Sequence, residues 1–176
     1  MKHYDFAPRF ELLYQKALAR YDQGVRQAAM LFDPAETAWL ADNGISAQTL
    51  FDYAEDHTNY GEPGLGNAVA IEAVRRTYFH VVQQGRPSGV ILDAATLPTK
   101  TDAVQGIAWL PRLIPKAKSK LRGELPASLM YCCGGDRAFF QQHDISPYEF
   151  LELVVCHEQD DAAIIAWVAA RIAARQ

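Results

Sequence analysis

Apolar residues recur every three or four positions over most of the chain, which is the spacing of one face of an α-helix. The first such series predicts one long helix and consists of Phe10, Leu13, Tyr14, Ala17, Leu18, Tyr21, Val25, Ala28 and Phe32. A second series predicts a helix from Asn67 to Gln84, which Gly85 ends. The pattern of the chain is therefore that of a helical protein.

Capping residues mark the ends of further helices. Residues 33–36, with the sequence DPAE, form a capping box with a proline in the first turn, and Gly44 supplies a left-handed stop. Ser46 begins the next helix, which runs to about Gly61. Residues 145–150, with the sequence ISPYEF, repeat the capping signal and predict a helix from Ser146 onward.

The remaining helix starts are less uniform. Two prolines lie four positions apart, so one helix either starts at Pro115, or starts at Pro111 and bends where Pro115 deletes a backbone hydrogen bond. Asp136 is expected to be the N-cap of the following helix, with Gly134 and Gly135 as the turn that leads into it. A last helix is expected from about Asp161.

Residues 85–106 are rich in Pro, Gly and Thr and contain no apolar run long enough to found a sheet. They predict a connector between an N-terminal helical half, residues 1–84, and a C-terminal half, residues 107–176. Each half alone buries too little surface to be independent, so the halves are expected to pack on each other. The expected fold is a single all-α domain over residues 1–176, with seven or eight helices and no significant sheet.

Composition narrows the function classes. A formal charge of −4 and a pI of about 5.7 give no basic surplus, so nucleic acid is not an expected partner. No apolar run approaches the roughly 18 residues of a membrane span and no signal peptide is recognised, so a soluble, cytoplasmic protein is expected, with no membrane partner. The three cysteines are then expected to be reduced thiols. A glycine-rich nucleotide loop is missing, and no organic cofactor is expected.

The C-terminal half contains three separated motifs, which are LPRLIPKAKSKLRG, YCCGGDRAFF and DDAAIIAWV in chain order. In these motifs and in their order, this half resembles a bacterial family of unknown function, domain of unknown function 5069. The positions that match the family pattern are Leu110, Pro111, Arg112, Lys116, Cys133, Asp136, Phe139 and Trp167. The positions that depart from it are Pro115, Cys132, Gly134, Gly135 and Arg137. Most departures fall in one loop, which suggests a role specific to this chain, and the resemblance implies no activity.

The whole chain, with DYAEDHTNYGEPG and AIEAVRRTYF ahead of that half, is similar in size and layout to small lyases of nitroaromatic breakdown. These enzymes convert hydroxylaminobenzoates to dihydroxybenzoates of the protocatechuate type and ammonia. The similarity implies a small aromatic carboxylate as the partner and no organic cofactor. Such a reaction needs acid and base groups, an anchor for the carboxylate and a slot for the ring.

The candidate catalytic residues lie near the end of one predicted helix. His57 is the acid/base candidate, with Asp56 or Glu55 as the carboxylate. Tyr53, on the same helix face as His57, is a candidate for substrate binding. The alternative is a solvated acidic face on which His57 is placed favourably at a helix C-terminus.

The candidate substrate-binding residues come from elsewhere in the chain. Arg112 or Arg76 can clamp a carboxylate through two hydrogen bonds, although such arginines more often form ion pairs between helices. The remaining candidates form the loop Cys133, Gly134, Gly135, Asp136 and Arg137, whose thiol is alternatively an inert core group. No metal site is expected, because the Cys and His residues lack chelating spacings. The rival hypothesis is a non-enzymatic helical ligand-binding or protein-interaction module, and the sequence leaves a homo-oligomer open.

Overall fold

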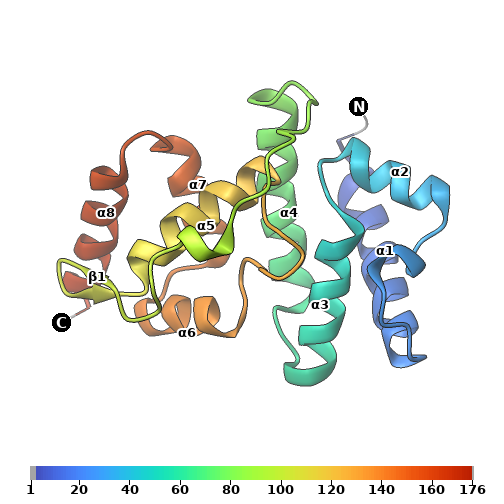
Figure 1. Cartoon of the computed structure of the whole chain (residues 1–176), viewed down its shortest axis with the longest axis horizontal. Helices are drawn as coiled ribbons and strands as arrows, with labels where there is room; N and C mark the ends of the chain where they lie inside the picture. The colour runs from blue at the N-terminus through green and yellow to red at the C-terminus, as the bar shows by residue number, and fades with distance from the viewer. Residues whose placement is uncertain (1–2, 176) are drawn as a thin grey trace. The chain divides into compact units, whose positions relative to one another are not determined.

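Eight α-helices and one short β-hairpin make up the regular structure in the computed structural model, which describes residues 3–175 (Figure 1). This confirms the all-α prediction. The chain divides into two compact units, Met1–Pro87 and Ser88–Gln176. The division falls at the start of the predicted connector, so most of residues 85–106 belong to the second unit. Within the described residues, no helix is both long enough and apolar enough to cross a membrane.

The first unit is a group of four helices. They are α1 (Phe6–Asp22), α2 (Pro34–Asp42), α3 (Ala47–Tyr60) and α4 (Gly64–Val81), with a 3₁₀ turn η1 (Ala28–Met30) between α1 and α2. Helix α1 packs against both α3 and α4, and Figure 1 shows α1 and α3 side by side. Their facing side chains form the core of this unit, which includes Phe10, Leu13, Tyr14, Ala17, Leu50, Tyr53, Ala54, Ala68 and Ile71.

The prediction of one helix from Phe10 to Phe32 was wrong in its length. Helix α1 ends at Asp22, and Gly24 follows it with φ +93°, a left-handed conformation that turns the chain. Phe32 is nevertheless buried, on a separate segment that returns to the core. Apolar residues therefore continue beyond the end of α1 because they are buried by tertiary packing and not because they lie on the same helix face.

The predicted caps and stops of α2 and α3 are confirmed. The Asp33 carboxylate accepts the Glu36 N–H at 2.9 Å, and the Glu36 carboxylate accepts the Asp33 N–H at 2.9 Å, which completes the capping box. Ser46 caps α3. Gly44 and Gly61 adopt left-handed conformations, with φ of +72° and +73°. Helix α4 differs from the prediction at both ends, since it spans Gly64–Val81 rather than 67–84.

The second unit contains the hairpin and the other four helices. In chain order its elements are η2 (Ala94–Thr96), β1 (Ala103–Val104), β2 (Ile107–Ala108), α5 (Leu110–Arg122), α6 (Gly134–His143), α7 (Pro147–Cys156) and α8 (Asp161–Ala173). Strand β1 is antiparallel to β2, with Ala103 opposite Ala108, and α5 packs against α7. Helix α5 has Pro111 in its first turn and continues through Pro115, which selects the second of the two predicted starts. The predicted starts of α7 and α8 are confirmed.

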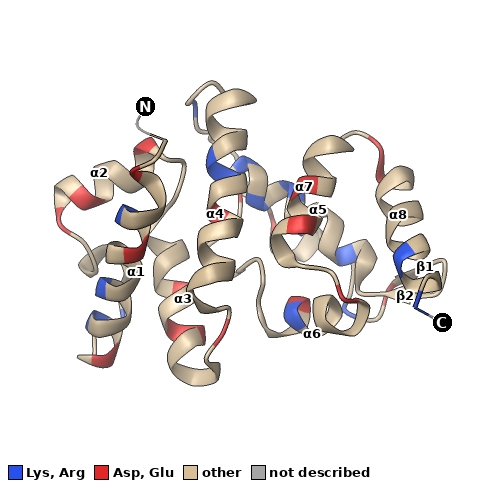
Figure 2. Cartoon of the chain, turned by 180° about the vertical axis from the view of Figure 1, so that it is seen from behind, with Lys and Arg blue, Asp and Glu red and all other residues tan. Residues whose placement is uncertain are grey.

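Helix α5 carries only positive charge, as its blue positions in Figure 2 show. Three of its basic residues pair with acids from three later segments. These pairs are Lys116 with Asp136, Lys118 with Asp161, and Arg122 with Glu158. The second and third pairs are partly exposed, and such pairs stabilise a protein by less than about 1 kcal/mol. The first is buried and is described with the candidate site below.

Removing the α2 cap should destabilise the protein measurably. We expect Asp33→Ala to lower the free energy of unfolding by about 1 kcal/mol, because the Glu36 N–H loses its acceptor. Asp42→Ala is the matched control at the other end of α2, where a negative charge is unfavourable to the helix dipole. Urea denaturation of both variants measures the difference, and an equal loss in the two would contradict the capping role.

His80 on α4 makes the stability of the protein depend on pH. Burial lowers the pKa of His80, and the positive charges of Arg76, His3 and Arg75 lower it further. The unfolded chain therefore binds the His80 proton at a higher pH than the folded chain does. The stability that this difference contributes is present above about pH 6.5 and is lost as the pH falls from there through the lowered folded pKa. Burial lowers the pKa of His143 as well, which acts in the same direction.

We expect His80→Gln to reduce the fall in Tm between about pH 7.5 and about pH 5.5. At the higher pH, the difference in Tm between the variant and the wild type measures the packing that the substitution removes. The change in this difference between the two pH values measures the effect of protonating His80. Identical pH dependence in the two proteins would remove His80 from this effect. Differential scanning fluorimetry over a pH series is sufficient.

Candidate functional site

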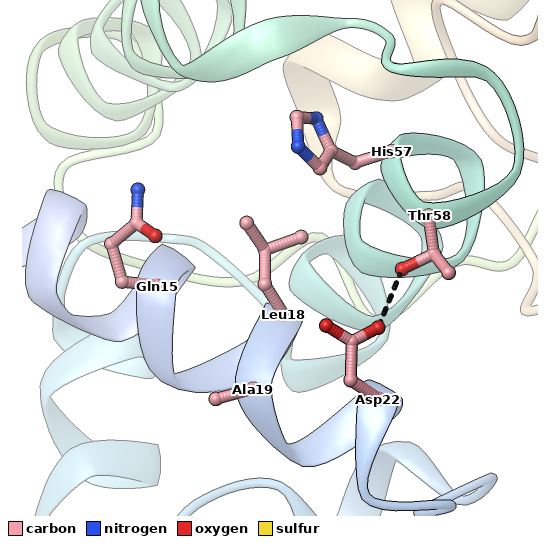
Figure 3. A pocket seen from close by; sticks show the side chains of 6 residues that line it. All are labelled: Gln15, Leu18, Ala19, Asp22, His57 and Thr58. Atoms are coloured by element: carbon pink, nitrogen blue, oxygen red, sulfur yellow. Dashed lines mark hydrogen bonds between the residues drawn. The ribbon is translucent and has the colours of Figure 1, made fainter.

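The first unit has an open hollow of about 510 Å³ between α1 and α3. Its lining residues are Gln15, Leu18, Ala19 and Asp22 from α1 and His57 and Thr58 from α3. Figure 3 shows the His57 imidazole extending from α3 above Leu18, with Gln15 across from it on α1. At the rim, the Thr58 hydroxyl donates to the Asp22 carboxylate at 3.2 Å. Polar and apolar side chains thus line the hollow together, with one imidazole among them.

His57 lies beside the ring of Tyr14. The Nδ1 atom of His57 is buried and has no hydrogen-bond partner among the described residues, and the same holds for the Tyr14 hydroxyl. The two rings meet edge to face, with their centroids 6.1 Å apart. Burial raises the pKa of Tyr14, and the negative charge of Glu62 raises it further, so this hydroxyl stays a proton donor. Buried polar atoms are rarely left without a partner, and their presence here is consistent with a site that a ligand or water completes.

The predicted carboxylates do not hydrogen-bond this nitrogen. Glu55 is exposed and accepts the Tyr21 hydroxyl at 3.1 Å, and Asp56 is half-buried on the same helix. Since Nδ1 has no partner, neither Glu55 nor Asp56 orients the imidazole through it. Tyr53 is buried and donates its hydroxyl to the Glu72 carboxylate at 2.6 Å, so its polar end is engaged inside the unit.

Both predicted carboxylate anchors donate to groups of the protein itself. Arg76 is 6% exposed, its Nε donates to the Asn43 side chain at 2.5 Å, and its guanidinium lies 5.0 Å from the centroid of the Phe6 ring. Burial lowers the pKa of Arg76. Arg112, in the second unit, donates to the Pro98 carbonyl at 2.8 Å. A carboxylate ligand would have to compete with these acceptors.

The second unit contains a buried pair of opposite charges. Lys116 Nζ lies 2.7 Å from Asp136 Oδ2, and the two side chains are 1% and 0% exposed. The carboxylate also accepts the Trp109 indole N–H at 3.0 Å and the Cys132 backbone N–H at 2.8 Å. Lys116 Nζ makes a further contact of 3.1 Å with Cys133 Sγ. We call these five residues the Lys116 cluster.

The structure corrects the predicted role of Asp136. Cys133 is the N-cap of α6, and Gly134, Gly135 and Asp136 are its first three residues. The Asp136 carboxylate reaches back beyond the helix start to the Cys132 N–H, which a true N-cap does not do. Arg137 also belongs to α6 and donates to the Cys132 carbonyl at 2.7 Å. The predicted leading turn is therefore the first turn of the helix itself.

Two residues of the Lys116 cluster have left-handed backbone conformations although neither is glycine. Trp109 has φ +70° and Cys132 has φ +67°. Such conformations cost of order 1–3 kcal/mol each and persist where neighbouring structure holds them. Here the Asp136 carboxylate bonds the indole of one residue and the backbone N–H of the other. One carboxylate thus fixes two strained segments.

Sequence reasoning placed some members of this cluster and missed others. Cys133 and Asp136 were candidates, whereas Lys116 was noted only as a position that matches the family pattern and Trp109 was not a candidate. The available signal was Lys116, which lies among the apolar positions of α5. A buried ammonium requires a partner, so this lysine indicated a buried acidic group elsewhere in the chain. Among the described residues, no three His, Cys, Asp or Glu side chains lie close enough together to hold a metal ion.

Gly135 is required by the indole ring. A Cβ at this position would lie 2.3 Å from Trp109 Cζ2, and the ring is held by its bond to Asp136. We expect Gly135→Ala to destabilise the protein by about 1–3 kcal/mol, as overpacking does. Gly134→Ala is the matched control, since its Cβ would meet nothing closer than an Arg137 nitrogen at 3.8 Å. Chemical denaturation measures both, and equal stability of the two variants would show that the ring yields easily.

The comparisons with known proteins concern the second unit. A family model described as Domain of unknown function (DUF5069) matches residues 96–176, which confirms the resemblance of the C-terminal half and covers the whole Lys116 cluster. No curated protein and no solved structure matches the chain. No named relative therefore supports the hydroxylaminobenzoate lyase resemblance, and what is shown is a domain of unknown function over residues 96–176.

Proposed function

We propose that the hollow at His57 binds a small molecule and that His57 transfers protons to and from it. The observation that carries this proposal is the buried, unpartnered Nδ1 of His57 on a side chain that also lines the hollow. An imidazole titrates near neutral pH, so it is suited to give up and take back a proton in one reaction. The Tyr14 hydroxyl beside it supplies a hydrogen-bond donor.

The reaction proposed is the conversion of a hydroxylaminobenzoate to a dihydroxybenzoate and ammonia, without an organic cofactor. Protonated His57 gives a proton to the N-hydroxyl oxygen, the N–O bond breaks and water leaves. Neutral His57 then accepts a proton from a second water as its oxygen bonds to the ring. A further water hydrolyses the resulting imine and releases ammonia. Acid and base roles thus alternate on one side chain.

The other predicted residues of the first unit keep supporting roles in this proposal. Glu55 or Asp56 contributes negative charge near His57, because both lie on α3, although neither hydrogen-bonds Nδ1. Tyr53 holds its place through Glu72. Arg76, which belongs to the same unit as His57, is the proposed anchor for the substrate carboxylate, whereas Arg112 and residues 133–137 belong to the second unit and are given no role at this hollow. Substrate titration of variants at these positions separates binding from proton transfer.

Ammonia release tests the proposal. Purified protein incubated with 4-hydroxylaminobenzoate should release ammonia without added NAD(P)H, and His57→Ala should lower kcat by about 10²–10⁴-fold. Thr58→Val is the matched control, because it removes a rim hydroxyl and no titratable group. No release from any positional isomer would sink the lyase proposal, and full activity of His57→Ala would remove that residue from the mechanism.

A second candidate function is binding without turnover. It is favoured by the absence of a carboxylate partner at Nδ1, since catalytic histidines are usually oriented by a second group. A binding module should take up small aromatic carboxylates saturably, lose this binding in His57→Ala, and release no ammonia. Isothermal titration with 4-aminobenzoate, beside the ammonia assay, separates the two functions.

A further inference from the structure

The second unit contains a thiol that the proposed proton transfer at His57 does not use. Cys133 is the N-cap of α6, and the residue is half-buried. Lys116 Nζ donates a hydrogen bond to this sulfur at 3.1 Å. Of the other two thiols, Cys132 is buried and Cys156 is exposed. Cys133 is thus a half-buried residue whose sulfur is in contact with an amine.

Two sources of positive charge lie beside the sulfur, the Lys116 ammonium and the N-terminus of α6. The Lys116 ammonium is almost completely buried and is held in place by Asp136 at 2.7 Å. The α6 N-terminus adds the partial positive charge of its free N–H groups. An ammonium and a helix N-terminus are the two features that most often make a cysteine nucleophilic in proteins. Cys156 is the last residue of α7, so it lies at the opposite end of its helix.

We propose that Cys133 is a modification site for hydrogen peroxide and that Lys116 captures the oxidised sulfur as a sulfenamide. In this product a covalent bond joins Lys116 Nζ to Cys133 Sγ. The two atoms are already in contact at 3.1 Å, so the covalent bond can form when the two side chains move closer together. The proposal is independent of the function proposed for the His57 hollow.

The first step is oxidation of the thiol. Cys133 gives its proton to solvent, and the sulfur attacks one oxygen of hydrogen peroxide. The S–O bond forms and the O–O bond breaks, so the sulfur loses two electrons and the peroxide gains them. The departing hydroxide takes a proton from the Lys116 ammonium and leaves as water. This step yields a sulfenic acid and, in the same event, a neutral amine beside it.

The second step needs no further oxidant. The lone pair of the neutral Lys116 amine attacks the sulfur, the N–S bond forms and the S–O bond breaks. The hydroxyl leaves with one amine proton as water. The product has lost the ammonium charge that faced Asp136, so a buried ion pair becomes a buried carboxylate held by Trp109 and Cys132 alone. A small thiol attacks the sulfur, which breaks the N–S bond, returns the amine to Lys116 and leaves a mixed disulfide at Cys133. A second small thiol then attacks this disulfide, which releases the Cys133 thiol and forms the disulfide of the small thiol.

The chain supplies its own comparison in Cys156. Exposure alone predicts that peroxide oxidises Cys156 before Cys133, whereas the proposal predicts the reverse order. We expect Cys133 to form sulfenic acid on the order of 10-fold faster than Cys156. Brief treatment of the intact protein with hydrogen peroxide, trapping with a cyclic dione and site-resolved mass spectrometry measure both rates in one sample.

Longer treatment without the trap tests the capture step. The expected product is a peptide pair joined through Lys116 and Cys133, lighter than the sum of its parts by two hydrogen atoms and restored by a thiol reductant. Cys133→Ser should abolish it, and Cys156→Ser is the matched control that should leave it unchanged. Both measurements are made on the wild-type protein, so the buried ion pair of Lys116 and Asp136 need not be disrupted by substitution.

Three results would overturn the proposal. Oxidation of Cys156 ahead of Cys133 would show that the Lys116 contact does not activate the thiol. A disulfide within the single peptide that holds Cys132 and Cys133 would assign the capture to the neighbouring thiol. Accumulation of sulfinic acid at Cys133, without a bond to Lys116, would show that the amine does not reach the sulfur.

Discussion

The buried ion pair between Lys116 and Asp136 is the interaction on which the second unit depends. Removing two charges from water costs several kcal/mol for each ion, and the cost is offset only when the remaining donors and acceptors are satisfied. Here the carboxylate is satisfied from three directions, by an ammonium, an indole and a backbone amide. The middle of α5, the residue before α5 and the turn before α6 are thereby fixed at one point. The left-handed backbones of Trp109 and Cys132 are consistent with this constraint.

The fold was predictable where its causes are local. The Asp33 and Ser146 capping boxes each involve residues three positions apart, so the sequence alone shows both partners. The length of α1 was not predictable from apolar spacing, because Phe32 is buried by packing on a separate segment. Asp136 was given the wrong role for a similar reason. A cap explained it locally, whereas its charged partner lies twenty positions earlier on another helix.

The candidate site divides in the same way. That His57 lies near the end of α3 followed from helix boundaries, and the structure places it in a hollow beside α1. Glu55 accepts a hydrogen bond from Tyr21, and Arg76 donates one to Asn43. Nothing in the sequence near Glu55 or Arg76 indicates these partners. Each side chain had several chemically suitable partners, and only the packing of the helices selects one. Residue inventory therefore identified groups capable of acid/base chemistry without showing which of them are engaged elsewhere.

The second compact unit begins at Ser88, whereas the family match begins at residue 96. The residues in between are bound to the rest of the unit: the Leu92 N–H donates to the Glu124 carbonyl at 2.8 Å, and the Ser88 hydroxyl donates to the Glu124 carboxylate. The segment that matches the family model is thus shorter than the compact unit in which it packs. A fragment cut at the family boundary would lose Leu92, so the Glu124 carbonyl just after α5 would lose the backbone donor that it has in the intact chain.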